Sequence, residues 1–181
     1  MHVLARLCPW CWLAGSFANM AMPDSTVRDF VSWSHASLAV VTSLLYWKWP
    51  DEAGLIMVVL LSMAYFCHDL AYCTVKDAFF WHHVLCIFGL PLAALYETNR
   101  YCLAVIFGFL ELSNCGLYPS SLFPESSTLH KCSLCWFATR VVFLPFLMQG
   151  LTNDFIRLLC FILWVSGVVW LVLSYAHTLR Q

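Results

Sequence analysis

Charged residues are scarce in this chain of 181 residues, and their scarcity excludes several classes of protein. Asp, Glu, Lys and Arg make up 10% of the sequence, whereas about a quarter is usual for a soluble domain, so they cannot cover a water-facing surface. Nine Lys and Arg balance ten Asp and Glu, which leaves no basic face for nucleic acid. The sequence also lacks a Gly-rich phosphate loop, a nucleophile elbow and an H-E-x-x-H zinc motif.

Apolar residues, by contrast, form long uninterrupted runs. They make up 62% of the sequence, and the mean hydropathy is +0.78. A membrane-spanning helix needs roughly 20 mostly apolar residues. The runs are continuous, without the alternation of a transmembrane barrel, so they predict an all-α, multi-pass transmembrane bundle of six or seven helices. The expected helices are Leu7–Met22, Phe30–Trp47, Gly54–Val75, Ala78–Tyr96, Tyr101–Tyr118, Ser133–Gly150 and Phe155–Ala176.

The connections between these runs hold most of the charges and turn formers, and the longest predicted connection is Pro119–Lys131. Short connections predict antiparallel neighbours. Residues 1–27 are predicted to be an N-terminal apolar helix or signal-anchor, and residues 28–181 a single domain. Arg6 before an apolar run is typical of a signal peptide, but no clean small-x-small cleavage site precedes Pro23, which favours a retained helix.

Ionisable residues inside the apolar runs are the candidate functional residues. Placing such a group in a bilayer costs a few kcal/mol or more, so its presence needs a reason. Because they fall on five different predicted helices, a bundle can gather them around one internal polar cavity. They are His35, His68, Asp69, His82, His83, Glu111 and Arg140, with Asn114 and Gln149 as polar companions.

Helical spacing relates some of these residues to one another. Glu111 and Asn114 are three apart and share a face, as do Arg28 and His35, which are seven apart. His82 and His83 differ by about 100° around the axis, so one of them can point into the bundle while the other lies at its side.

A histidine that titrates near neutrality can act as a general base, and a carboxylate such as Asp69 can orient it. Glu111 and Arg140 can pair in the same interior. The alternative is that these groups only form hydrogen bonds between helices. Their number favours a functional cavity, either for catalysis or for binding a lipid headgroup.

Two C-x-x-C pairs, Cys8–Cys11 and Cys132–Cys135, raise the question of a zinc or redox site. Neither pair lies in a βαβ context, and most of the chain separates them. Many of the ten cysteines fall within apolar runs, where cysteine behaves as a small apolar residue. No metal site is therefore predicted.

Several of these motifs, in this order and spacing, resemble the TLC-domain family, which includes the ceramide synthases and the translocating-chain-associated membrane proteins. The intramembrane His82-His83 pair is the most specific element, and the match runs from about Arg28 to the C-terminus. The resemblance implies a helical core of about six spans around a lipid-binding cavity. The motifs are Arg28, Ser34–Ala36, Tyr65–Asp69, Trp81–Gly89, Leu110–Asn114 and Ala138–Arg140.

The sequence departs from the ceramide synthases on the helix after the His-His pair. Those enzymes carry a pattern of the form H-D-x-x-D-x-x-L-E, which aligns here with Leu103–Glu111. The glutamate is present, but Leu103, Ala104 and Phe107 stand at the positions of the His-Asp pair and the later Asp. Apolar side chains cannot carry protons or bind a metal, which argues against N-acylation of a sphingoid base.

The L-E-x-S-N form is more similar to the small TLC domain-containing proteins, whose members are linked to membrane phospholipid composition. Cys115 stands where those proteins usually have Pro, and the connection Pro119–Lys131 is short by comparison. The resemblance implies an endoplasmic reticulum or plasma membrane location, with membrane lipids as partners, no nucleic acid and a homo-oligomer left open.

Three functions follow as hypotheses. The first is a lipid-binding protein that affects membrane lipid composition and needs no cofactor. The second is a ceramide-synthase-type N-acyltransferase with acyl-CoA as co-substrate and His82 or His83 as catalytic base. The third is a translocon-associated or structural membrane protein. The predicted cavity residues are Arg28, His35, Asp69, Glu111, Asn114 and Arg140.

Overall fold

The computed structural model describes residues 24–73, 75, 78–123 and 125–178, and in these residues the chain is helical with no strand. The predicted all-α bundle is therefore confirmed with six helices. The predicted helix Leu7–Met22, and with it nearly all of the N-terminal segment 1–27, lies outside the described residues. The helices are α3 (Asp24–Lys48), α4 (Glu52–Leu70), α5 (Ala78–Tyr96), α6 (Arg100–Leu122), α7 (Ser127–Met148) and α8 (Asp154–Thr178).

Polar residues of the predicted connections begin three of these helices. The side chain of Asn99 accepts a hydrogen bond from the backbone N–H of Cys102 at 3.1 Å, and Ser126 accepts one from Leu129 at 3.3 Å. Asp51 caps α4 in the same way through the N–H of Gly54. Because the first N–H groups of a helix have no partner inside it, these side chains fix where each helix starts.

The predicted connection Pro119–Lys131 is wrong in its extent. Helix α6 continues through Pro119 to Leu122, and α7 begins at Ser127, so only a few residues join them. Hydropathy reports where the apolar layer ends, whereas a helix can continue beyond that layer into polar surroundings. Proline lacks an N–H, but its carbonyl still accepts a bond, here from the N–H of Phe123 at 3.0 Å.

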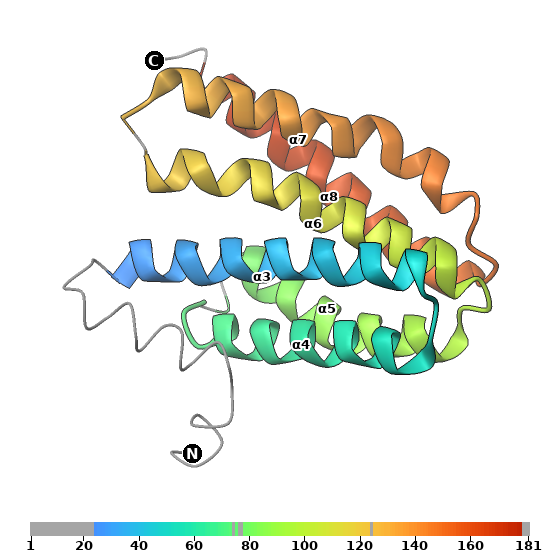
Figure 1. Ribbon diagram of the computed structural model, residues 1–181. Helices are drawn as coiled ribbons and strands as arrows, with labels where there is room; N and C mark the ends of the chain where they lie inside the picture. The colour runs from blue at the N-terminus through green and yellow to red at the C-terminus, as the bar shows by residue number, and fades with distance from the viewer. Residues whose placement is uncertain (1–23, 74, 76–77, 124, 179–181) are drawn as a thin grey trace.

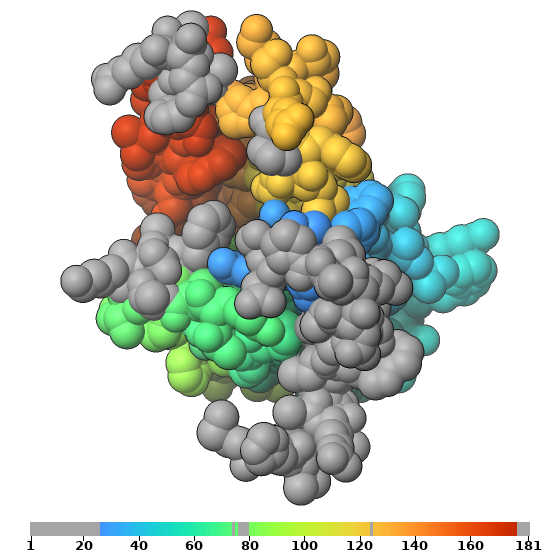
Figure 2. Space-filling view, turned by 90° about the vertical axis from the view of Figure 1, so that its left-hand side faces the viewer, coloured from blue at the N-terminus to red at the C-terminus, as the bar shows by residue number. Residues whose placement is uncertain are grey.

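The helices alternate in direction along the bundle, as the short connections predict (Figure 1). In this view α4 and α5 lie on one side, α6, α7 and α8 on the other, and α3 runs between them. Helix α3 packs against α6 and α4, and α8 packs against α7 and, less extensively, α5. The end at which α3 begins also contains the end of α4, the start of α5 and the end of α6; Figure 2 views the molecule from this end.

The largest core cluster joins α5, α6, α7 and α8 and extends into the α7–α8 loop. Its most completely buried members, each at most 2% exposed, are Ile106, Leu144, Leu151 and Ile156. Smaller clusters join α3 to α4, and α3 to α6 with α4. Buried apolar contacts therefore extend along the length of the bundle and join the two groups of helices.

The outer surface of the bundle is apolar, which matches a lipid environment. Four helical stretches are long and apolar enough to cross a membrane, and α5 adds the shorter apolar stretch Phe80–Tyr96. On α8, Val169, Val172 and Leu173 are each more than half exposed, which would be costly in water but not among lipid chains. The four stretches are Glu52–Leu70, Arg100–Leu122, Ser127–Met148 and Asp154–Ala176.

Candidate functional site

At the end of the bundle where α3 begins, an ion-pair cluster of Arg28, Asp69, Cys73 and His83 ties three helices together. The Nε of Arg28 donates to Oδ1 of Asp69 at 2.8 Å, and its Nη2 donates to Oδ2 at 3.0 Å. The Nδ1 of His83 lies 3.2 Å from Oδ2 of the same carboxylate. Asp69, at the end of α4, therefore lies between the guanidinium of Arg28 on α3 and the imidazole of His83 on α5.

The ligand atoms of Asp69, Cys73 and His83 all lie within 4.8 Å of one another, a spacing that a metal ion would accept. However, the guanidinium of Arg28 contacts both carboxylate oxygens, and its Nη2 also lies 3.3 Å from Sγ of Cys73. A divalent cation at this point would face the fixed positive charge of Arg28. The electrostatics of the cluster therefore favour arginine as its cation.

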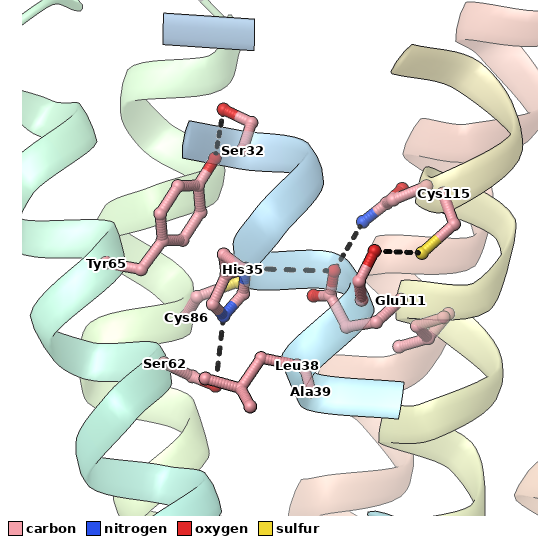
Figure 3. Close-up of polar contacts among 12 residues, drawn as sticks. Ser32, His35, Leu38, Ala39, Ser62, Tyr65, Cys86, Glu111 and Cys115 are labelled. Carbon is pink, nitrogen blue, oxygen red and sulfur yellow. Dashed lines mark hydrogen bonds and ion pairs between the residues drawn. The ribbon is translucent and has the colours of Figure 1, made fainter. Parts of the chain in front are cut away.

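His35 of α3 occupies the centre of a second polar group between α4 and α6 (Figure 3). It is only 2% exposed, and its Nε2 lies 3.1 Å from Oγ of Ser62. On the other side its Nδ1 lies 3.9 Å from Oε2 of Glu111. Its ring stacks on Tyr65 at 3.9 Å between centroids, and the Tyr65 hydroxyl donates to Oγ of Ser32 at 2.8 Å.

Glu111 and Arg140 are connected through Asn114 rather than by a direct ion pair. The Nδ2 of Asn114 donates to Oε2 of Glu111 at 3.1 Å, and Nη1 of Arg140 donates to Oδ1 of Asn114 at 3.3 Å. The guanidinium also lies over the ring of Phe137, 5.3 Å from its centroid. The Asn114 amide thus connects Glu111 on α6 to Arg140 on α7. Glu111 in turn lies beside His35, so all four residues belong to the second polar group.

A cavity of about 90 Å³ lies beside this second group, among α4, α5, α6, α7 and α8. Four of the predicted site residues line it: His82, Glu111, Asn114 and Arg140. The remaining lining is almost entirely apolar, and includes Ala93, Leu103, Ile106, Ile156 and Leu163. The cavity therefore has one polar region and a longer apolar wall.

The predicted site residues Arg28, His35, Asp69 and His83 do not line this cavity. Arg28, Asp69 and His83 form the ion-pair cluster, and His35 connects to the cavity through Glu111. The two adjacent histidines therefore have different surroundings. His82 faces the cavity, whereas His83 faces Asp69, as the turn of about 100° between consecutive helical residues allows.

A second hollow, of about 510 Å³, lies between α7 and α8 toward the opposite end of the bundle. It shares no lining residue with the cavity, and of the residues singled out in the sequence it contains only the polar companion Gln149. Met148, Phe161 and Trp164 make its wall largely apolar. Its size alone does not make it the better candidate, because the titratable groups gather elsewhere.

Ser32, Ser62 and Cys86 were not predicted as site residues. The two serines hold Tyr65 and His35, but other serines in these helices, such as Ser34 and Ser113, bond to carbonyls of their own helix. Sequence alone cannot tell these uses apart. Cys86 carried a usable signal, because it follows His82 by four residues and so shares its helical face.

Only one of the two C-x-x-C pairs lies within the described residues. Cys8 and Cys11 lie outside the described residues, so the structure does not test a joint zinc site. Cys132 and Cys135 are exposed and form no disulfide. Both lie in the first half of α7, where they add to its outer surface.

Comparisons of the chain with protein-family models, with curated proteins and with solved structures found no match. The resemblance to the TLC-domain family therefore remains a prediction from the motifs. Functional inference depends on the chain's own residues and on the cavity that they line.

Proposed function

We propose that this membrane protein binds a lipid in the cavity beside Arg140 and affects the lipid composition of its membrane, as a member of the TLC-domain family. The observation that supports this proposal is the composition of the cavity wall. Charged and polar groups, namely His82, Glu111, Asn114 and Arg140, meet an apolar wall in one cavity between the helices. A lipid has the same division between a polar headgroup and an acyl chain.

The polar groups of the cavity lie well inside the bundle. Glu111 is eleven residues before the end of α6, or about 16 Å along the helix at 1.5 Å per residue. It is 6% exposed, and Arg140 on α7 is 8% exposed. Such groups are costly within a membrane and commonly mark a binding or transport pathway. A bound headgroup would repay that cost by supplying hydrogen-bond partners.

The acyltransferase alternative draws support from His82, which lines the cavity and lies 3.7 Å from Sγ of Cys86. His83 is a weaker candidate for a catalytic base because its side chain does not line the cavity. Leu103 and Phe107, at positions where ceramide synthases carry acidic or histidine residues, supply only apolar wall. We therefore keep N-acyl transfer to a sphingoid base as the second candidate.

Lipid retention by the purified protein tests the first candidate. Lipids extracted from detergent-purified protein and measured by mass spectrometry are expected at a fixed ratio to protein. Ala93→Leu adds three carbons to the cavity wall and is expected to lower this ratio several-fold. Ala94→Leu is the matched control, because Ala94 packs against the cluster of Tyr46, Leu55 and Ala104 instead. Equal retention in both variants would contradict the proposal.

Labelled acyl-CoA and a sphingoid base test the second candidate. If the purified protein forms an N-acylated product, and His82→Ala abolishes it while the protein stays folded, the chain is an N-acyltransferase. We expect no such product. A lipidomic comparison of cells with and without the chain is expected to show altered phospholipid acyl chains, whereas a change confined to ceramides would favour the enzyme.

A further inference from the structure

A cysteine and a histidine one helical turn apart face the cavity from α5. Sγ of Cys86 lies 3.7 Å from Nε2 of His82, within hydrogen-bond distance for sulfur, and both residues line the cavity. A thiol next to an imidazole is the arrangement that activates a sulfur nucleophile, since the imidazole can take the thiol proton.

Arg140 supplies a second, independent indication that a ligand belongs here. Its side chain is more than nine-tenths buried and lines the same cavity. Its Nη1 donates to Asn114, but among the described residues its Nε has no hydrogen-bond partner. An unsatisfied N–H of a cation in apolar surroundings is costly, so a ligand oxygen is the natural acceptor. An oxygen that gains negative charge would be held most strongly.

The apolar wall indicates what carries that oxygen. From the polar region the lining continues past Gly89 and Ala93 on α5 to Ile156 and Leu159 on α8. At about 90 Å³ the cavity would hold only the carbonyl end of an acyl chain, near Sγ of Cys86 and Nε of Arg140, while the rest of the chain would follow the apolar wall outward between the helices. The ligand class is therefore an acyl ester or acyl thioester.

We propose that Cys86 accepts a long-chain acyl group from such a donor and holds it as a thioester whose carbonyl lies in the cavity. This inference rests on the proposed lipid-binding function. Sγ of Cys86 attacks the carbonyl carbon while the thiol proton passes to Nε2 of His82. The carbonyl oxygen becomes an oxyanion that accepts a hydrogen bond from Nε of Arg140.

The tetrahedral intermediate then collapses. The bond between the carbonyl carbon and the leaving oxygen or sulfur breaks, and that atom takes the proton back from His82. The products are the Cys86 thioester and either a lysolipid alcohol or a free thiol, according to the donor. Atoms and charges balance without an oxidant, a reductant or a metal.

Cys160 provides a matched control within the same cavity. It is buried, lines the cavity from α8 and has no disulfide, but among the described residues no histidine lies within hydrogen-bond distance of it. Both thiols line the same cavity, Cys86 half-buried and Cys160 buried. The imidazole of His82 distinguishes the two thiols.

The test uses the full chain in detergent or nanodiscs and two probes, each with an alkyne at the end of a palmitoyl chain. One probe is the acyl-CoA, and the other is phosphatidylcholine in vesicles. We expect hydroxylamine-sensitive label that peptide mapping places on Cys86. His82→Gln is expected to slow labelling at least tenfold, and Cys86→Ala to abolish it, with Cys160→Ala unchanged. Label from only one probe would identify the donor as a thioester or a lipid ester.

Several results would overturn the proposal. They are label on Cys160 equal to that on Cys86, label confined to the exposed Cys67, Cys132 and Cys135, or an unchanged labelling rate in His82→Gln. Peptide mapping of the wild-type protein decides the site even if Cys86→Ala does not fold. Lipid retention is measured on the same samples. If the protein retains lipid but Cys86 carries no label, only the thioester proposal is contradicted. If no lipid co-purifies with the protein, the proposed lipid-binding function is contradicted.

Discussion

Glu97, just after α5, accepts hydrogen bonds from both the backbone N–H and the hydroxyl of Thr152, which lies between α7 and α8. The same carboxylate accepts bonds from the N–H groups of Asn99 at 2.9 Å and Asn153 at 3.0 Å. Glu97 is 1% exposed. One side chain therefore joins the α5–α6 and α7–α8 loops at the end of the bundle opposite the ion-pair cluster.

The stability of the protein is expected to depend on the ionisation of Glu97. Burial opposes ionisation, but the hydrogen bonds from Thr152, Asn153 and Asn99 outweigh it and lower the pKa of Glu97 to about 2. Because the folded-state pKa lies below the unfolded value, the contribution is complete above about pH 4.5 and is lost as the pH falls toward 2. Thermal unfolding in detergent across this range measures the loss.

Glu97→Gln tests the same contacts at neutral pH. An amide cannot supply the charge that strengthens these bonds, so we expect a loss of about 1–3 kcal/mol in the free energy of unfolding. Glu52→Gln is the control, because Glu52 is largely exposed and pairs with Arg100 at the surface, where ion pairs contribute little. Equal effects of the two substitutions would show that the loop contacts of Glu97 are unimportant.

The ion-pair cluster predicts a coupled pair of substitutions. Asp69→Asn removes the carboxylate that Arg28 contacts through two hydrogen bonds and is expected to destabilise the fold by about 1–3 kcal/mol, since the half-buried guanidinium loses its counter-charge. A double-mutant cycle with Arg28→Gln is expected to show a favourable coupling energy of about 1 kcal/mol or more. If the two substitutions changed the free energy of unfolding independently, the ion pair between Arg28 and Asp69 would be contradicted. The exposed pair Asp154–Arg157 supplies the comparison.

His82 and His83 are expected to separate binding from stability. His83→Ala removes the imidazole beside Asp69 and is expected to lower the unfolding temperature measurably, with little effect on the lipid-to-protein ratio of folded material. His82→Ala is expected to lower the lipid-to-protein ratio with little effect on the unfolding temperature, because the His82 side chain lines the cavity. Unfolding temperature and lipid content, measured on the same preparations, check both expectations. The opposite pattern would place the lipid beside His83.

Gly116 permits the close approach of α6 and α7. A β-carbon there would lie 2.0 Å from a ring carbon of Trp136, whose Nε1 donates to the carbonyl of Leu112 at 2.9 Å. Gly116→Ala is therefore expected to cost about 1–3 kcal/mol. Gly167→Ala on α8 is the control: its β-carbon would meet Phe137 at an ordinary 3.6 Å, so the gain in helix propensity should make it neutral or stabilising. Thermal unfolding of both variants compares them.

Some features of this fold could be predicted from the sequence and others could not, depending on whether they change its hydropathy pattern. The apolar run Ala78–Tyr96 predicted α5 with both ends correct, because polar residues flank it. The run Gly54–Val75 overestimated α4, which ends at Leu70, because hydropathy does not detect the turn at Ala71 and Tyr72. Polar residues within spans identified the candidate residues, because their cost in lipid is visible in the sequence itself.

The apolar runs alone show that the chain is helical and apolar, and which side chains are costly in a membrane. Contacts between helices could be known only from the folded structure. They place His83 beside Asp69, His35 between Ser62 and Glu111, and Arg140 beside Asn114. The physical reason is that spacing along one helix fixes the angle between its side chains, whereas the rotation of each helix toward its neighbours depends on how all the helices pack together.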